Sequence, residues 1–224
     1  MHACRKATVL AAALLLGATA CRAPAASHDA TAHHDFVDVA HWAAVFDDPA
    51  RDAWQKPDAV VGALGLRPGM TVADLGAGTG YFERRLAGAV GAVGTVFAVD
   101  TEPGMVEHLR ARAEREGTDN VVPVLASPAT PRLPAGAVDV VLIVDTFHHL
   151  DDRLAYLHAL RRVLRPGGRV AIVDWRKRPL PVGPPPEHKL PRGQVVEEME
   201  AAGYALVGAP DVLPYQYFLI FAPR

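Results

Sequence analysis

The chain has 224 residues, of which 50% are hydrophobic and 21% are charged, and its formal net charge is −2 at pH 7. This length and apolar content suffice for one globular domain with a sizeable core. Because positive and negative residues are mixed along the chain, we expect no basic face and no nucleic-acid partner, which favours a small molecule.

The first 21 residues have the pattern of an export signal. A basic start is followed by small apolar residues over 7–20, a run shorter than the roughly 20 apolar residues that cross a bilayer. The run ends in Ala18-Thr19-Ala20-Cys21, which resembles the site where bacterial lipoproteins are cleaved and lipidated on cysteine. It departs from that pattern at Ala18, where leucine is favoured.

The predicted organisation is therefore a signal peptide over 1–21, a flexible tether over 22–41 and one folded domain over 42–224. Ordinary signal cleavage after Ala20 or Ala25, or a buried N-terminal helix, are the alternatives.

Cys4 and Cys21 are the only cysteines, and both precede the predicted domain, so we expect neither a disulfide nor a thiolate metal site there. With a lipid on Cys21 the protein would be a periplasmic, membrane-anchored lipoprotein, and that lipid would be its only contact with a membrane. If translation starts further along the chain, the protein is cytoplasmic.

From residue 70 onward, short β-branched runs alternate with segments of helical periodicity. The expected strands are residues 70–75, 95–99, 121–125, 138–144 and 169–174. Apolar residues at helical spacing between them are Phe82, Leu86 and Val90, then Met105, Leu109 and Ala113, then Leu154, Leu157 and Leu164. This alternation predicts a parallel sheet with helices on its faces.

The last part of the chain follows another pattern. The segment Arg165-Pro166-Gly167-Gly168 predicts the end of a helix and a sharp reversal into the next strand. A proline-rich stretch then leads to a helix over 194–202 and to strands over 204–207 and 215–222. Since no helix separates these two strands, they should pair antiparallel at one edge. The expected fold is α/β, with a doubly wound, seven-stranded, mostly parallel sheet and an antiparallel C-terminal edge strand.

The most informative segment is Val-Ala-Asp-Leu-Gly-Ala-Gly-Thr-Gly-Tyr over residues 72–81, where a strand runs into three alternate glycines. Glycine permits a sharp turn and lets a ligand approach main-chain amides without a Cβ in the way. A dinucleotide fingerprint would need a glycine where Tyr81 stands, and a Walker loop would need a lysine. What remains is the spacing D-x-G-x-G-x-G, formed by Asp74, Gly76, Gly78 and Gly80.

This spacing resembles motif I of the class I S-adenosylmethionine-dependent methyltransferases, and the resemblance extends from about Asp58 to the C-terminus. It implies a Rossmann-like fold, S-adenosyl-L-methionine as the cofactor and transfer of a methyl group. In the family the motif I acid lies near the methionine moiety, which places Asp74 there. A carboxylate suits a ligand with a cationic amino group better than one with a pyrophosphate. The alternative is that Asp74 only braces the loop.

The second expected strand ends at Asp100, which can accept hydrogen bonds from both ribose hydroxyls. A solvated acid at the strand end is the alternative. The third strand ends at Ala126 and Ser127, where many family members carry an acid that contacts adenine, and Ser127 followed by Pro128 departs from that pattern. The residues expected at the cofactor are Asp74, Gly76, Ala77, Gly78, Thr79, Gly80, Tyr81, Asp100, Thr101, Glu102, Met105, Ala126, Ser127 and Asp145.

The segment Asp-Thr-Phe-His-His-Leu over residues 145–150 resembles the corresponding segment of quinone-type C-methyltransferases. Adjacent histidines point in different directions, so one of them can face the acceptor as a general base while the other packs. His148, His149 and Asp145 are the catalytic candidates. We expect no metal site, because adjacent histidines rarely converge on one ion without further ligands.

Residues 42–57 include Phe46, Trp54 and Lys56, and this stretch either folds over the cofactor as an apolar lid that excludes water or packs against the sheet edge. The expected function is methyl transfer to a small-molecule acceptor by an exported enzyme, which would need a supply of S-adenosylmethionine outside the cytoplasm. The alternative is a non-catalytic lipoprotein that binds S-adenosylmethionine or a nucleoside on the same fold. No motif identifies the acceptor or an oligomeric state.

Overall fold

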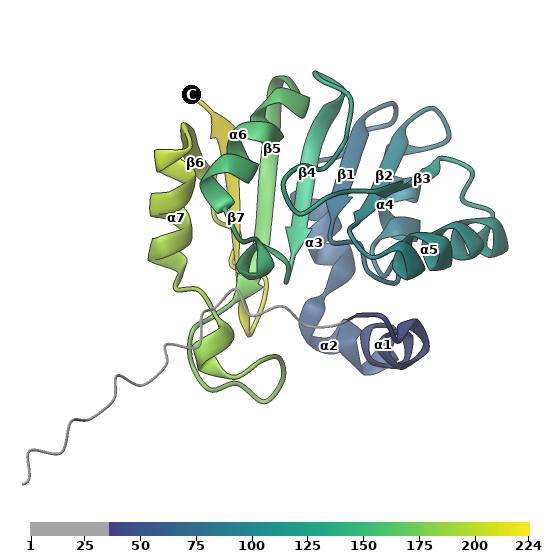
Figure 1. Ribbon diagram of the computed structural model, residues 1–224, viewed down its shortest axis with the longest axis horizontal. Coiled ribbons are helices and arrows are strands. Elements are labelled where there is room, and N and C mark those ends of the chain that lie inside the picture. Colours follow the sequence, from purple (N-terminus) through teal and green to yellow (C-terminus); the bar gives the residue numbers. More distant parts are fainter. Residues whose placement is uncertain (1–35) are drawn as a thin grey trace, which may run out of the picture.

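The computed structural model describes residues 36–224 (Figure 1). The predicted signal peptide, Cys21 and most of the predicted tether lie outside these residues. Within residues 36–224, every helix is too short or too polar to cross a lipid bilayer.

A seven-stranded sheet forms the centre of the fold, with the strand order β3-β2-β1-β4-β5-β7-β6 (Figure 1). The strands are β1 (Thr71–Leu75), β2 (Thr95–Asp100), β3 (Val121–Leu125), β4 (Val138–Val144), β5 (Leu164–Trp175), β6 (Tyr204–Gly208) and β7 (Gln216–Pro223). Strands β3, β2, β1, β4 and β5 are mutually parallel, and β7 is antiparallel to both β5 and β6. The predicted mixed sheet with an antiparallel C-terminal edge is confirmed. Within that edge pair β7 is inserted next to β5, and β6 is the outermost strand.

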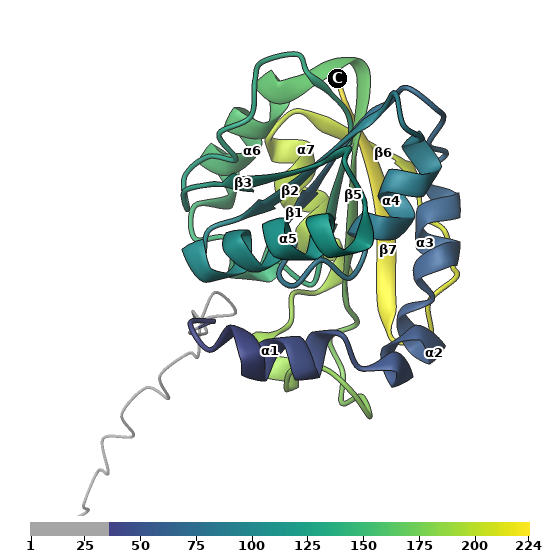
Figure 2. The same ribbon diagram turned by 90° about the vertical axis from the view of Figure 1, so that its right-hand side faces the viewer.

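Helices cover both faces of the sheet, as a doubly wound fold requires (Figure 2). They are α1 (Val39–Phe46), α2 (Asp52–Gln55), α3 (Pro57–Ala63), α4 (Glu83–Val90), α5 (Pro103–Glu116), α6 (Arg153–Val163) and α7 (Arg192–Ala201), with 3-10 helices η1 (Pro49–Arg51), η2 (Phe147–His149) and η3 (Pro186–His188). Residues of α6 and α7 share one core cluster with Ala73 and Leu75 of β1. Residues of α3, α4 and α5 share the other with Val72, because successive side chains of a strand point to opposite faces.

The start of β5 differs from the prediction. Helix α6 ends at Val163, and Leu164, which was expected on the helix, is the first residue of β5. The segment 165–168 does not separate helix from strand: it bulges from β5 between the pairs Val138↔Leu164 and Val140↔Arg169. Arg165 precedes a proline and is therefore biased toward extended backbone, while Gly167 supplies the positive φ of +80°. Leu154 is also not on the apolar face of α6, since it is 48% exposed.

The N-terminal segment crosses the carboxyl ends of the strands. Figure 2 shows α1 and α2 below the sheet, outside the two helical layers. Helix α1 begins at Val39, ahead of the predicted domain start at residue 42.

The glycine loop after β1 requires a glycine at residue 76. Gly76 has φ +75°, and a Cβ there would lie 2.3 Å from Oγ1 and 2.4 Å from Cγ2 of Thr146, which follows β4. We expect Gly76→Ala to lower the free energy of unfolding by roughly 2–4 kcal/mol in urea titrations, through backbone strain and overpacking.

Gly88→Ala is the matched control, because Gly88 is exposed on α4 and nothing lies within 4 Å of an added Cβ. It should stabilise the protein by about 1 kcal/mol or less. Equal stability of the two variants would show that the loop tolerates a side chain at residue 76.

Candidate active site

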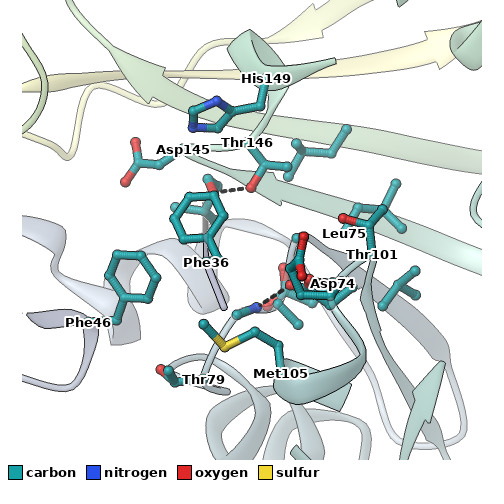
Figure 3. A pocket seen from close by; sticks show the side chains of 18 of the residues that line it. Phe36, Phe46, Asp74, Leu75, Thr79, Thr101, Met105, Asp145, Thr146 and His149 are labelled. Atoms are coloured by element: carbon teal, nitrogen blue, oxygen red, sulfur yellow. Dashed lines mark hydrogen bonds between the residues drawn. The ribbon is translucent and has the colours of Figure 1, made fainter. Parts of the chain in front are cut away.

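A cavity of about 740 Å³ lies between the N-terminal segment and the carboxyl ends of the central strands. The strand order reverses between β1 and β4, and open α/β sheets bind ligands outside the carboxyl ends of the strands at such a point. Figure 3 shows side chains from strand ends, among them Asp74 and Asp145, around the same space as Phe46 of α1.

Nearly all residues that the sequence predicted for the site line this cavity. They are Asp74, Gly76, Ala77, Gly78, Thr79, Tyr81, Asp100, Thr101, Glu102, Met105, Ala126, Ser127, Asp145, His148 and His149. Gly80 is not among the lining residues. Its position has φ +90°, and a Cβ there would lie 3.0 Å from Leu109 and 3.3 Å from Glu83, so it serves close packing beneath the loop.

The glycine loop does not offer a row of free amides, which corrects the expectation from the sequence. The amides of Gly76 and Ala77 donate to the Val99 carbonyl at 2.8 and 3.0 Å, and the Gly80 amide donates to the Ala77 carbonyl at 3.0 Å. The Gly78 amide donates to Asp100 Oδ2 at 2.8 Å. The glycines are therefore needed for their positive φ angles and for close packing, and the loop's polar surface comes mainly from the neighbouring side chains.

Asp100 joins the glycine loop to the end of β2. Besides the Gly78 amide it accepts the Glu102 amide on Oδ1 at 3.0 Å. Burial raises the pKa of the Asp100 carboxyl, against the opposing effect of these backbone donors. Each carboxylate oxygen has a second lone pair, so the oriented group can still accept hydroxyl donors from a ligand.

Two carboxyl groups face each other beneath the loop. Asp74 and Glu83 are 3% and 4% exposed, and each carboxyl group acts electrostatically on the other, while neither Glu83 carboxylate oxygen has a hydrogen-bond partner within the described residues. Burial, with the neighbouring Asp100 charge adding to it, raises the pKa of Asp74 to about 7. Burial and the Asp74 charge hold the pKa of Glu83 well above its ordinary value. Ionising both groups together is therefore unfavourable.

The N-terminal segment is held to the glycine loop by polar contacts. Asp47 accepts from Thr79 Oγ1 and from Arg112 Nη1, both at 2.9 Å. Asp52 accepts from the Tyr81 hydroxyl and from Arg85 Nη2.

Aromatic side chains of this segment form a wall of the cavity. Trp42 and Phe46 stack with centroids 5.2 Å apart, and Trp54 packs on Trp175 at the end of β5, also at 5.2 Å. All four line the cavity, and Trp54 at the same time packs against the end of β5, so the segment has features of both predicted arrangements and its action as a lid over the cofactor stays a prediction. Lys56, predicted with them, is not among the lining residues.

Asp145 follows β4 with an unusual backbone, φ +52°, in the left-handed region. Its Oδ1 accepts from Gln216 Nε2 at 2.7 Å, and Gln216 Oε1 accepts from Gln55 Nε2 at 2.9 Å. Burial, followed by the charge of Asp174, raises the pKa of Asp145 to about 7. Gln55 and Gln216 lie 161 positions apart, and no sequence signal connects them to the site.

The two histidines have different surroundings. His148 Nδ1 lies 2.9 and 3.0 Å from the two carboxylate oxygens of Asp174, with the residues 3% and 0% exposed. Burial lowers the pKa of His148, but the charge and hydrogen bond of Asp174 outweigh it, so the pKa is raised. His149 instead packs edge-on against Phe36 at 6.1 Å.

The Asp174 carboxylate holds the imidazole proton on Nδ1 and leaves His148 Nε2 as the nitrogen that can take up a proton. The sequence predicts Asp174 only as the last residue of a strand.

The acidic pair makes stability depend on pH. Because the folded-state pKa values of Asp74 and Glu83 exceed their unfolded values, the folded state binds more protons above about pH 4, and stability falls as pH rises toward and through the folded values. Glu83→Gln removes one of these groups, so the loss of unfolding free energy between about pH 5 and pH 8 should become smaller. Urea titrations at the two pH values measure it.

Glu114→Gln is the control, since Glu114 is exposed on α5 and should leave the pH profile as in the wild type. Parallel profiles for the wild type and Glu83→Gln would contradict the raised pKa values assigned to the pair.

Comparisons with known proteins agree with the fold and with the methyl-transfer reaction that the sequence predicts. A family model described as a methyltransferase domain matches residues 72–168. The ubiquinone/menaquinone biosynthesis C-methyltransferase of Shewanella sp. strain ANA-3 is 31% identical over 129 residues, which cover 57% of this chain and 48% of that protein. The match thus spans about half the length of this curated relative.

Solved structures extend the likeness over most of the chain. A SAM-dependent methyltransferase from Aquifex aeolicus superposes with a TM-score of 0.79 at 31% identity, over 84% of this chain and 98% of that one. A TehB-like SAM-dependent methyltransferase from Corynebacterium glutamicum has a TM-score of 0.63 at 16% identity, over 83% of this chain and 98% of that one, and shares the fold. The chain therefore belongs to the S-adenosylmethionine-dependent methyltransferases and uses S-adenosylmethionine as its cofactor.

Proposed function

We propose that the protein methylates a small-molecule acceptor from which His148 removes a proton. The observation that carries this proposal is the buried His148–Asp174 pair in the wall of the cavity that the predicted cofactor residues also line. A partly enclosed cavity of about 740 Å³ is within the range of roughly 300–1,000 Å³ typical of small-molecule sites. The C-methyltransferase of quinone biosynthesis among the relatives supports a small-molecule acceptor.

The order of the strands suggests how the cofactor lies. Ala126 and Ser127 follow β3, Asp100 ends β2, Asp74 is near the end of β1, and Asp145 follows β4. An extended adenosyl ligand along this edge would place adenine at β3, the ribose hydroxyls at Asp100 and the cationic amino acid part between Asp74 and Asp145. The acidic groups suit the ammonium and the sulfonium of the cofactor, and raised pKa values near 7 let binding of these cations favour ionisation.

When bound, the cofactor supplies an electrophilic methyl group on its sulfonium. The protein's own part is to align the acceptor and to exclude water with the aromatic wall of Trp42, Phe46 and Trp54. Asp174 keeps the His148 ring oriented with Nδ1 protonated, and Nε2 accepts the proton that the acceptor loses. Asp145 lies on the cofactor side, and His149 packs against Phe36, which makes His148 the favoured base among the three candidates.

Label transfer tests the proposal. The protein is incubated with methyl-labelled S-adenosylmethionine and a bacterial envelope extract freed of macromolecules by ultrafiltration, while calorimetry measures cofactor affinity. His148→Gln should reduce label transfer by about 10²–10⁴-fold with an affinity close to that of the wild type. Asp100→Ala should instead weaken cofactor binding by at least about tenfold, because two charge-assisted hydrogen bonds are lost.

His149→Gln provides the comparison between neighbouring histidines. If His149→Gln abolishes transfer and His148→Gln does not, the assigned base is wrong. In a parallel reaction with the macromolecules retained by the filter, label uptake by these macromolecules and none in the filtrate would refute a small-molecule acceptor. Cofactor binding without any transfer would favour the non-catalytic alternative.

We also propose export as a lipoprotein, a proposal that rests on the sequence of residues 1–21 alone. Mass spectrometry of the N-terminus of the protein isolated from its own cells should find a lipid-modified Cys21. An N-terminus that retains Met1, or one that begins beyond Cys21 without lipid, would rule it out.

A further inference from the structure

The cavity contains one cation that the sequence did not predict for the site. Arg51, the last residue of η1 in the N-terminal segment, lines it together with the glycine loop. Its guanidinium carbon lies 4.1 Å from the centre of the ring of Tyr81, the residue that directly follows the glycine loop. The same carbon lies 5.9 Å from the centre of the Trp54 ring. The guanidinium group is thus in cation–π contact with one ring next to the glycine loop and with one ring of the N-terminal segment.

The hydrogen bonds of Arg51 within residues 36–224 go to neutral acceptors. Nη1 donates to the Phe46 carbonyl at 3.1 Å, and Nη2 and Nε donate to Gln55 Oε1 at 3.2 and 3.4 Å. Asp145 and Asp74 act on it through their charges, yet neither forms an ion pair with it in the described part of the chain. A guanidinium has five N–H donors, so Arg51 retains capacity for an anion.

The neighbours of Arg51 place that anion on the cofactor side of the cavity. Tyr81 and Asp74 belong to the loop and strand that the cofactor is proposed to contact, and Asp145, whose charge acts on Arg51 as well, follows β4 on the same side. At neutral pH S-adenosylmethionine has one anionic group, the α-carboxylate of its methionine part, close to its ammonium.

We propose that Arg51 binds the α-carboxylate of S-adenosylmethionine, so that the lid segment supplies the one positive charge that the cofactor requires from the protein. The inference rests on the cofactor placement of the proposed function and adds a contact from outside the matched domain of residues 72–168. Asp74 and Asp145 then face the cationic groups while Arg51 faces the anionic one. Binding of the cofactor is thereby coupled to the position of the lid.

A double-mutant cycle between protein and ligand tests this contact. Calorimetry compares S-adenosylmethionine with decarboxylated S-adenosylmethionine, which lacks only the carboxylate. The wild type should prefer the intact cofactor by roughly 10–100-fold, because the decarboxylated ligand loses a charge-assisted hydrogen bond and leaves a partly buried cation without its anion. Arg51→Met should bind the two ligands with affinities within about threefold of each other, and Arg51→Lys should keep part of the preference.

Arg85→Met is the matched control. Arg85 also anchors the segment, through Asp52 and Asp58 at 3.1 and 2.9 Å, and its guanidinium lies 5.5 Å from the centre of the same Tyr81 ring, but it does not line the cavity. This variant should keep the wild-type preference for the ligand with the carboxylate, even if a more loosely held lid lowers the affinity for both ligands.

The inference is overturned if Arg51→Met keeps the wild-type preference for the intact cofactor, including the case in which it lowers the affinity for both ligands by the same factor, as loss of a purely structural residue would. Failure of the proposed methyl transfer has a different signature: the wild type would bind the cofactor with its preference for the carboxylate intact and yet transfer no label to a small molecule.

Discussion

Four carboxyl groups stand at the carboxyl ends of four neighbouring strands: Asp100 on β2, Asp74 on β1, Asp145 after β4 and Asp174 on β5. Parallel strands end at one edge of the sheet, so the fold itself brings these like charges together. Hydrogen bonds within the protein compensate two of these groups more fully than the other two. The charge balance of the active site follows from this difference.

Asp100 accepts two backbone amides, and Asp174 pairs with His148. Asp74 and Asp145 have no such full compensation, and burial raises the pKa of each to about 7. These two groups therefore gain most from a cationic ligand, such as the sulfonium and the ammonium of the cofactor. The lid contributes the opposite charge, so that the cavity as a whole matches a ligand of mixed charge.

Much of the fold was predictable because it follows from local patterns. β-branched runs alternating with helical periodicity gave the strands and their helices, and the glycine spacing at residues 76, 78 and 80 located the loop. The pattern did not reveal that the amides of Gly76, Ala77, Gly78 and Gly80 donate to acceptors within the protein, or that residue 80 lies against Leu109 instead of facing the cavity. Both features depend on the residues that pack beneath the loop, and the spacing of glycines along the sequence does not show which residues these are. Local spacing also misplaced Leu164, because a proline and two glycines fit a turn as well as a bulge.

The sequence by itself determined the α/β sheet, the glycine loop and the acids at the strand ends, since each depends on residues close together in the chain. Only the tertiary structure decided that His148 pairs with Asp174, that Gln55 reaches Gln216, and that Arg51 enters the cavity. These contacts join segments that the sheet brings together from 26 positions apart, in the histidine pair, to 161 positions apart, in the glutamine pair. A side chain's partner across such a distance depends on strand order and helix packing, so these pairings become visible only once the chain is folded.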